Sequence, residues 1–402
     1  MKPLRVLIVD DSVTMRRLIR SILEADSRLE VIAEAGTARE ARDAVNTYRP
    51  DVMTLDIEMP NMSGLEFLDR LMRHRPMPVI MVSTLTRKGS DVAVEAMSLG
   101  AIDCVEKPKV GASEDTFSKL ADTVVLAARA RVSGPRPKKQ NVSPRQNRSF
   151  QRICLIGGST GAVDAIERTL QSFPSDCPPT LITQHMPEPF LVSFAARLNP
   201  LVAPDVRLAV DGMPLMPGQV LIAPGGAYHL NVEGTSSLRV KLYEGPLVSG
   251  HRPSVDSMFL SARHVAHKAV AGILTGMGRD GAEGMRALRD AGAKTLGQSK
   301  ETCVVFGMPE LRANWGQWKD GRTLINLDKS FCSLLKFPSV RGQYDHNFTE
   351  KCFRKIDLYC PGRIRDWGYR RGCYFNNIRV MRCHLSLGSG CRCWRDEPFS
   401  TS

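Results

Sequence analysis

The chain has 402 residues, of which 43% are hydrophobic and 24% charged, a composition typical of globular proteins with room for about two or three domains. It contains no apolar run of membrane-spanning length and no signal peptide, so we expect a soluble, cytoplasmic protein without direct membrane insertion. The formal net charge of +13 is concentrated in one linker and in residues 310–402, so we expect no nucleic acid among the partners of the remaining chain.

Residues 1–130 alternate between predicted strands and predicted helices. The strand patterns are short apolar runs that end in polar residues: Leu4–Val9, Asp51–Leu55, Val79–Val82 and Ile102–Val105. Helical patterns separate them, one with Val13, Leu18, Ile22 and Leu23 and others near residues 37–46, 64–74, 88–98 and 116–130. This α/β alternation predicts a doubly wound, five-stranded parallel sheet with its site at the carboxyl ends of the strands.

Polar residues at these strand ends form a coherent set. Asp10 and Asp11 follow the first strand, and Asp56 follows another. Clustered carboxylates repel one another unless a hard cation lies among them, and oxygen ligands suit Mg²⁺. Lys107 and Ser83, after two further strands, would offer a positive charge and a hydroxyl to a phosphoryl group. Each residue alone could be a helix cap or a solvated side chain, but together they indicate a phosphoryl-accepting site.

Three motifs in this region resemble the receiver domain of bacterial response regulators over residues 3–127. They are Val9–Ser12, Leu55–Pro60 with Gly64, and Val105–Pro108. The resemblance implies that Asp56 accepts a phosphoryl group from a histidine kinase, with Asp10, Asp11 and Asp56 around Mg²⁺. It also implies that Lys107 pairs with the phosphoryl group and that Ser83 is the switch hydroxyl. Cys104 occupies a position where receivers often carry an aromatic switch residue, so signal transmission can differ in detail.

Residues 131–151 have the composition of a linker. The stretch is rich in Pro, Ser, Lys and Arg and has almost no apolar residues, as in Ser133–Lys139 and Ser143–Arg148. Such a sequence cannot bury a core and predicts an extended, solvated tether. A basic docking motif is the alternative.

Strand and helix patterns resume in residues 152–309. The apolar run Ile153–Ile156 leads into Gly157-Gly158-Ser159-Thr160-Gly161, and a helical pattern with Ile166 and Leu170 follows. A Gly-x-Ser-x-Gly turn between strand and helix presents its hydroxyl at the carboxyl edge of a sheet, next to the N–H groups of a helix N-terminus. The glycines suit a turn with positive φ and little room for side chains. Ser159 is therefore a candidate nucleophile, and a phosphate-binding glycine turn is the alternative.

Two further polar residues follow predicted strands of this domain. His185 follows Thr180–Gln184, and Asp280 follows Ala269–Thr275. Parallel strands gather their carboxyl ends at one edge, so Ser159, His185 and Asp280 could meet there as nucleophile, base and carboxylate. The order Ser–His–Asp differs from that of α/β-hydrolases, and a structural histidine or a helix-capping aspartate are the alternatives.

The remaining pattern of this domain includes another strand and an insertion. A helix is expected to begin near Ala282, and Thr295–Gln298 predicts one more strand. Between residues 205 and 243, short alternating pieces such as Gly218–Ile222 and Leu238–Leu242 predict a small antiparallel insertion in an otherwise Rossmann-like α/β domain.

Three stretches of residues 152–309 resemble the signatures of CheB methylesterase domains: Ile156–Gly161, Ile182–Pro187 and Leu274–Ala282. Ile222–Gly226 and His229 match a further segment, whereas Gly158 and Ala162 depart slightly from the family pattern. The resemblance implies that Ser159 attacks glutamyl methyl esters on chemoreceptors, the methyl-accepting chemotaxis proteins, with His185 as base and Asp280 orienting it.

The same resemblance implies the control and the partners of the enzyme. The backbone N–H of Met277 would help to hold the oxyanion, and the esterase would need no cofactor. Receptor glutamines would be deamidated by the same route. A CheA-type histidine kinase would phosphorylate Asp56, and the unphosphorylated receiver would cover the esterase cleft until then.

Residues 310–402 differ from the rest of the chain. They contain all four Trp residues, many Lys and Arg residues, and Cys383-His384 and Cys391-Arg392-Cys393, without periodicity. We interpret this tail as the product of a lost reading frame, with an unusual zinc site or a DNA-binding tail as alternatives. The alternative functions are accordingly a regulator with a binding output, or a methylesterase that its altered ending has inactivated.

Overall fold

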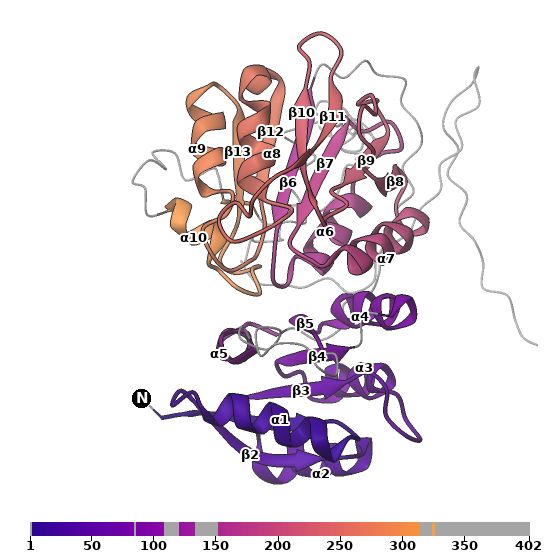
Figure 1. Ribbon diagram of the computed structural model, residues 1–402, viewed down its shortest axis with the longest axis vertical. Coiled ribbons are helices and arrows are strands. Elements are labelled where there is room, and N and C mark those ends of the chain that lie inside the picture. The colour runs from indigo at the N-terminus through magenta and orange to yellow at the C-terminus, as the bar shows by residue number, and fades with distance from the viewer. Residues whose placement is uncertain (1, 84–85, 108–119, 133–151, 314–323, 326–402) are drawn as a thin grey trace, which may run out of the picture. The chain divides into compact units, whose positions relative to one another are not determined.

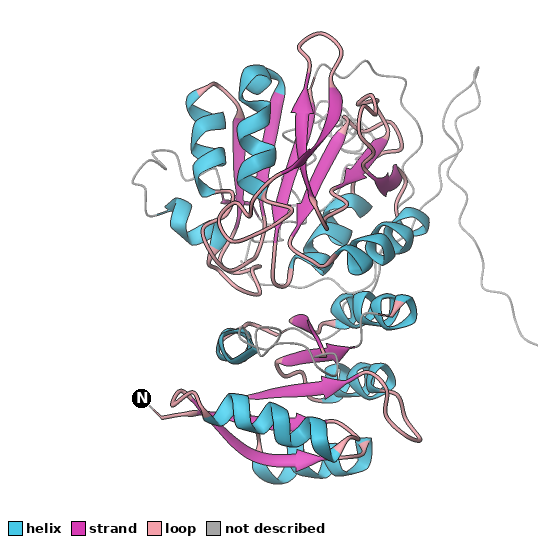
Figure 2. Ribbon diagram, in the orientation of Figure 1, coloured by secondary structure: helices cyan, strands magenta, loops and turns pink. Residues whose placement is uncertain are grey.

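The computed structural model describes all residues except 1, 84–85, 108–119, 133–151, 314–323 and 326–402 (Figure 1). Most of the predicted linker and nearly all of the predicted tail lie outside the described residues, so the predictions made for them remain untested. The described residues belong to one compact unit, residues 1–340. They form two parallel sheets, each covered by helices, together with one small antiparallel sheet (Figure 2).

The first sheet has five parallel strands in the order β2-β1-β3-β4-β5. The strands are β1 Leu4–Val9, β2 Leu29–Ala35, β3 Val52–Asp56, β4 Val79–Ser83 and β5 Asp103–Glu106. This confirms the predicted fold class for the N-terminal domain. Strand β2 was not named from the sequence, because its buried residues alternate with polar ones at the edge of the sheet.

Helices cover both faces of this sheet. They are α1 Val13–Glu24, α2 Ala38–Tyr48, α3 Gly64–His74, α4 Arg87–Leu99 and α5 Leu120–Ala128. Four of them begin after a Ser or Thr whose hydroxyl accepts an N–H of the first turn: Ser12, Thr37, Ser63 and Thr86. Alternate strand residues face opposite helices, so Leu7 and Val9 pack towards α2, α3 and α4, whereas Val6 and Ile8 pack towards α1 and α5.

The second sheet has seven strands in the order β14-β13-β12-β6-β7-β9-β8, and every neighbouring pair is parallel. Its strands are β6 Ile153–Gly158, β7 Thr180–Gln184, β8 Asp205–Leu208, β9 Gln219–Ile222, β12 Ala269–Ile273, β13 Lys294–Gln298 and β14 Leu324–Ile325. Strand β6 lies at the centre, between β12 and β7. The residues that follow these three strands therefore meet at one edge.

The helices of this domain divide between the two faces of the sheet. They are α6 Ala162–Gln171, α7 Glu188–Leu198, the short η2 Asn199–Leu201, α8 Val255–Ser261, the short η3 Ala262–Lys268, α9 Ala282–Asp290 and α10 Met308–Ala313. Cys154 and Ile156 of β6 face α6 and α7, whereas Ile153 and Leu155 face α8 and α9. The two faces are both apolar, as expected for a parallel sheet between helices.

The predicted antiparallel insertion is correct only in its second half. Strands β10 Tyr228–Glu233 and β11 Arg239–Glu244 form the two-stranded antiparallel sheet. The stretch Gly218–Ile222 was assigned to the insertion wrongly, because β9 pairs in parallel with β7 and β8 in the main sheet. Its three consecutive buried residues, Val220 to Ile222, are typical of a strand covered on both faces.

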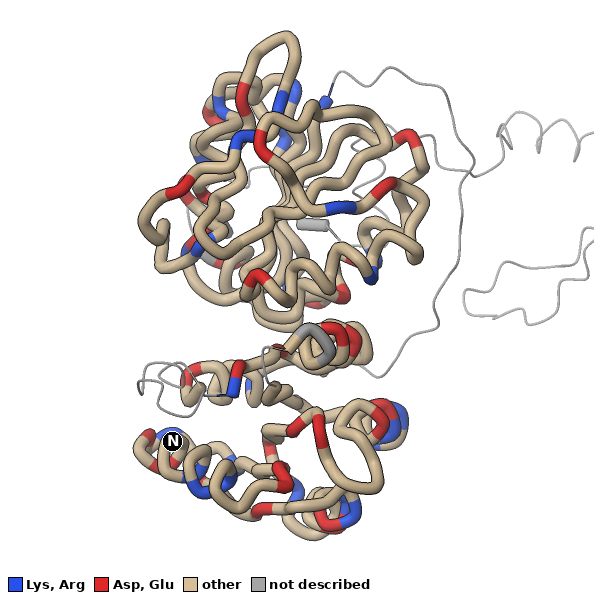
Figure 3. The backbone as a smooth tube through the Cα atoms, turned by 45° about the vertical axis from the view of Figure 1, so that its right-hand side comes forward, with Lys and Arg blue, Asp and Glu red and all other residues tan. Residues whose placement is uncertain are grey.

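The described surface is mixed in charge. Figure 3 shows acidic and basic positions interspersed along the helices of both domains, a distribution typical of solvated helix faces. None of the helices in the described ranges combines the length and the apolar character that crossing a bilayer requires.

Candidate functional site

Ser159 lies in the turn between β6 and α6. The residue is 8% exposed, and its backbone N–H donates to the Thr275 carbonyl at 3.1 Å. Its own carbonyl accepts the Gln184 side-chain amide at 2.9 Å and the Ala162 N–H at 3.0 Å. The neighbouring strands therefore hold Ser159 in place from both sides.

The glycines of this turn have two different roles. Gly161 has a φ of +76°, so the expected positive φ is present there. Gly157 and Gly158 instead allow close packing, because a Cβ would lie 2.3 Å from a methyl of Val255 and 2.5 Å from Cβ of Ala162, respectively. The small side chain of Ala162 is thus part of the same tight contact.

His185 lies next to Ser159 across the sheet. Gly158 and Gln184 are paired residues of β6 and β7, and Ser159 and His185 follow them directly. The backbone N–H of His185 donates to the Gly158 carbonyl at 3.1 Å. Its ring Nε2 lies 2.7 Å from Oδ2 of Asp280, whereas the buried Nδ1 has no hydrogen-bond partner among the described residues.

Asp280 is completely buried and fully hydrogen-bonded. Besides His185, its carboxylate accepts the Ser254 hydroxyl at 2.7 Å and the N–H groups of Val255 and Asp256 at 2.7 and 2.9 Å. Burial opposes the charge, but His185 and these donors outweigh burial and lower the pKa of Asp280. The carboxylate is therefore ionised and fixed, as required of a group that orients a histidine and stabilises its cation.

Asp256 is a second buried acid, which the sequence reasoning missed. It is 3% exposed, and it accepts the N–H of Gly284 at 2.7 Å and the hydroxyl of Ser249 at 3.3 Å. Burial, together with the charge of Asp280, raises the pKa of Asp256 to about 6. An Asp in the first turn of a helix reads as an ordinary helix residue, so the sequence carried little signal for it.

Two further histidines lie close to the site. The ring of His251 is stacked on that of His185, with centroids 3.8 Å apart and planes 8° from parallel, and sequence reasoning did not single it out. His229 is completely buried, and its Nδ1 accepts the Ser254 N–H at 3.2 Å. Its Nε2 therefore carries the proton and donates to the Pro246 carbonyl at 2.9 Å, so His229 has a structural role.

Met277 lies in the loop between β12 and Asp280. The preceding Gly276 approaches Ser159 so closely that a Cβ would lie 2.7 Å from that of the serine. The Gly276 carbonyl accepts N–H groups of Gly307 and Met308 at 3.1 and 2.8 Å, which fixes the loop. Met277 itself is 43% exposed. Its backbone N–H thus belongs to a fixed loop beside the nucleophile.

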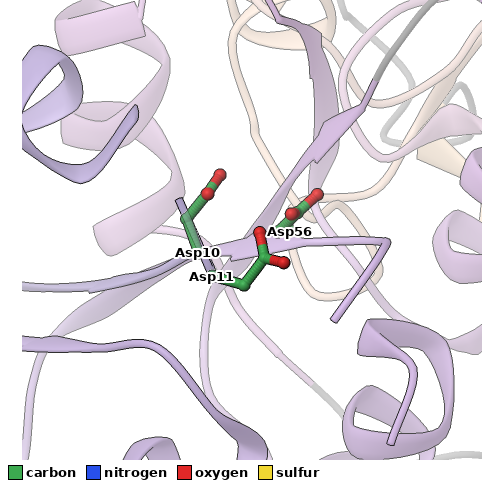
Figure 4. Close-up of side chains that lie close together, drawn as sticks. All are labelled: Asp10, Asp11 and Asp56. Atoms are coloured by element: carbon green, nitrogen blue, oxygen red, sulfur yellow. The ribbon is translucent and has the colours of Figure 1, made fainter. Parts of the chain in front are cut away.

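The predicted acidic cluster of the first sheet is present (Figure 4). Oxygens of Asp10, Asp11 and Asp56 all lie within 4.8 Å of one another, where β1 and β3 end. The ammonium of Lys107 lies 2.9 Å from Asp10 and 2.8 Å from Asp56. Gly64 is required nearby, because a Cβ there would lie 1.9 Å from the Asp56 carbonyl oxygen.

The protonation of this cluster reflects its burial. Desolvation, assisted by Asp10, outweighs Lys107 and raises the pKa of Asp56. Burial disfavours the Lys107 cation, but its bonds to Asp56 and Asp10 prevail and raise its pKa. The Ser83 hydroxyl is buried at the end of β4 and donates to the Gly89 carbonyl at 3.4 Å. Cys104 lies on β5, where burial raises the pKa of its thiol.

Comparisons with known proteins match both domains. The family model "Response regulator receiver domain" matches residues 6–114, and the model "CheB methylesterase" matches residues 154–319. A protein-glutamate methylesterase/protein-glutamine glutaminase of Agrobacterium fabrum is 48% identical over 347 residues, which are 84% of this chain and 98% of that protein. A protein of Caulobacter vibrioides with the same description is 48% identical over 339 residues, 83% of this chain and 98% of its own length.

A solved structure is also similar. The crystal structure of the Thermotoga maritima CheB methylesterase catalytic domain is 36% identical, with a TM-score of 0.40, and covers 41% of this chain and 88% of that one. Taken with the two sheets and their sites, the two family models and the two relatives define a response regulator whose output domain is a hydrolase. The chain belongs to the CheB family of protein-glutamate methylesterases/protein-glutamine glutaminases.

The family match continues beyond residue 309, where the resemblance noted from the sequence ended. It reaches residue 319, and the structure places helix α10 and strand β14 after Gly307. Strand β14 pairs in parallel with β13 at the edge of the main sheet. A short helix and a parallel edge strand therefore follow Gly307 among the described residues.

Proposed function

We propose that Ser159, His185 and Asp280 are the nucleophile, the general base and the orienting carboxylate of the methylesterase. The observation that carries the proposal is the 2.7 Å contact between His185 Nε2 and Asp280 Oδ2, together with the unpaired, buried Nδ1. With its proton on Nε2, the neutral ring has a lone pair on Nδ1. That nitrogen is the one left to take the proton of Ser159.

The reaction then follows from these positions. The Ser159 oxygen attacks the ester carbonyl while His185 takes the serine proton, and Asp280 stabilises the imidazolium that forms. The proton passes to the leaving oxygen, and methanol departs. Water attacks the acyl-enzyme with His185 again as base, which frees a glutamate carboxylate and restores Ser159. A glutamine side chain would lose ammonia by the same route.

The oxyanion of each tetrahedral intermediate would be held by backbone N–H groups. The Met277 N–H, in the loop fixed by Gly276, is one candidate. Fixed N–H donors that face a developing oxyanion contribute much of the rate enhancement in acyl transfer. The substrates would be glutamyl methyl esters and glutamines on chemoreceptors, in the cytoplasm.

The receiver would carry the control. Three carboxylates within 4.8 Å of one another fit the oxygen ligands that Mg²⁺ requires, so Asp10, Asp11 and Asp56 would hold the ion. When bound, Mg²⁺ neutralises the charge on the phosphoryl group in transfer. Asp56 would accept that group from a CheA-type histidine kinase, Lys107 would pair with it, and the Ser83 hydroxyl would turn towards it.

Contacts between the two domains suggest how the signal reaches the esterase. The hydroxyl of Thr160, next to Ser159, donates to Asp103 of β5 at 2.8 Å. Ser98 of α4 donates to Glu167 of α6 at 3.1 Å. Phosphorylation of Asp56 would shift the population from this packed state to an open state in which the esterase site is accessible. The change in the free-energy difference between the two states would equal the extra stabilisation that the phosphoryl group gives to the open state.

The test is methanol release from membranes that carry methylated chemoreceptors, with Mg²⁺ and with or without a small phosphodonor. The wild type should release methanol faster with the phosphodonor, and Asp56→Asn should show only the basal rate. An equal increase in Asp56→Asn would contradict control through Asp56.

A further inference from the structure

His251 lies against the proposed base and has no part in the steps above. Its ring is stacked on His185 at 3.8 Å, nearly parallel. His185 is therefore fixed in three ways: by the hydrogen bond of its backbone to β6, by Asp280 at Nε2, and by His251 on one ring face. The first two contacts leave the ring free to tilt about its axis, whereas a ring stacked on its face restricts that tilt.

The backbone holds His251 in a tight hairpin turn. Val248 and His251 exchange two backbone hydrogen bonds of 3.1 and 3.0 Å. The residues between them, Ser249 and Gly250, have φ values of +53° and +81°, and two positive φ values in succession define a tight two-residue hairpin turn. These bonds belong to the backbone, so a change of the His251 side chain leaves the turn itself intact.

The chain that follows His251 also supports Asp280. Arg252 donates to the carbonyls of Gly226 and Gly245, each at 2.7 Å, which anchors the segment. Ser254 and the next two backbone N–H groups then bind the Asp280 carboxylate. One short stretch, residues 251–256, thus supplies both the ring on the face of His185 and the donors that fix its carboxylate partner.

We propose that His251 is a positioning residue for His185. Its stacked ring restricts the tilt of the His185 ring, so that the buried Nδ1 remains available for the Ser159 proton while Nε2 stays on Asp280. When His185 takes the serine proton, the π face of the His251 ring lies against the new cation and stabilises it. The inference rests on the proposed role of His185 and adds a residue that acts through it.

The test compares His251→Ala with His251→Phe in the full-length protein, with phosphodonor present. A cation–π contact of ordinary strength predicts that His251→Ala lowers kcat for methanol release roughly 5- to 30-fold with KM unchanged. His251→Phe retains a flat aromatic face and should recover kcat to within about threefold of wild type. His267→Ala is the matched control, because His267 is exposed at the amino end of β12, away from the site.

The two variants give results that can overturn the proposal. Unchanged kcat in His251→Ala, or equal losses in His251→Ala and His251→Phe at wild-type melting temperature, would overturn the proposal. If His251→Ala does not fold, His251→Gln removes the aromatic face at a closer side-chain volume and takes its place. Ser159→Ala in the same assay distinguishes failure of the proposed function from failure of the role proposed for His251. If Ser159→Ala is as active as wild type, the proposed function is wrong, whatever the His251 variants show.

Discussion

Asp256 and Asp280 link helices α8 and α9, because the carboxylate at the start of each helix accepts hydrogen bonds from the first turn of the other helix. Asp280, which precedes α9, accepts the N–H groups of Val255 and Asp256 in the first turn of α8. Asp256 in turn accepts the N–H of Gly284 in the first turn of α9. The exchange ties the two helices together and places two carboxylates close to each other, and only Asp280 contacts His185. The closeness of the two carboxylates causes electrostatic repulsion, which together with burial raises the pKa of Asp256.

Replacement of Asp256 by Asn should stabilise the protein at neutral pH. The pKa of Asp256 is about 6 in the folded protein and near 3.8 when unperturbed. The stability it contributes is therefore fully present below about pH 4 and is lost as the pH rises through about 6. Asn can still accept the Gly284 N–H, so Asp256→Asn should melt a few degrees higher than wild type at pH 8. The difference should vanish near pH 4 in scanning calorimetry, and a constant difference across this range would contradict the account.

Replacement of Asp280 by Asn should remove most activity without removing the fold. With its oxygen in place of Oδ1, the Asn would still accept the Ser254 hydroxyl and the Asp256 N–H. Its NH₂ in place of Oδ2 would leave the Val255 N–H without an acceptor, would face Nε2 of His185 and would force the ring proton onto Nδ1. A ring in that tautomer cannot take the serine proton, and the analogous change in the serine-protease triad costs about 10⁴-fold. We expect a loss of roughly 10³- to 10⁴-fold in kcat for methanol release. Asp290→Asn, at the exposed end of α9, is the control, and an Asp280→Asn enzyme of near-normal activity would rule out this geometry.

Replacement of Lys107 by Met should make the receiver depend on a divalent cation. Lys107 pairs with both Asp10 and Asp56, and without it these buried acids repel each other. The variant should melt several degrees lower than wild type in EDTA. Mg²⁺ should raise its melting temperature more than that of wild type, since binding to the folded state alone stabilises it. Lys2→Met, at an exposed position, serves as the control. Equal melting curves with EDTA and Mg²⁺ would mean that the cluster binds no Mg²⁺.

Replacement of Thr160 by Val should raise the basal esterase activity. Val keeps the shape of Thr but leaves the partly buried Asp103 carboxylate without the Thr160 hydroxyl, which costs about 1–3 kcal/mol in the packed state. The state in which the receiver packs on the esterase should therefore lose population to the open state. Methanol release without phosphodonor should then rise roughly fivefold or more. Thr169→Val is the control, because the Thr169 hydroxyl donates within α6 to Ala165. A basal rate that stays at the wild-type level would show that this contact does not restrain the enzyme.

Sequence reasoning found the residues that follow strands. Ser159 and His185 come directly after β6 and β7, and Asp280 follows the loop after β12, so the rule that sheet edges gather such residues was sufficient. The same rule placed Asp10 and Asp56 together in the receiver. In each case, a short apolar run ending in a polar residue was the signal.

The same rule could not find His251 or Asp256. His251 follows a two-residue turn and not a strand of the main sheet, and its contact with His185 joins residues far apart in the sequence. Asp256 looks like a solvated residue in the first turn of a helix until α9 is packed beside it. Strand β9 was misassigned because a four-residue strand between glycines and prolines offers too little pattern to tell a buried strand from a hairpin.

The most direct test of the account is the activity of Ser159→Ala. Methanol release from methylated chemoreceptor membranes should be measured with phosphodonor for wild type, Ser159→Ala and Ser172→Ala. Ser172 follows the other end of α6 and serves as the matched control. We predict that Ser159→Ala loses at least about 10³-fold in rate, as for other hydrolases that lose the nucleophile, while Ser172→Ala keeps the wild-type rate. Wild-type release by a folded Ser159→Ala protein would contradict the central claim that Ser159 is the nucleophile.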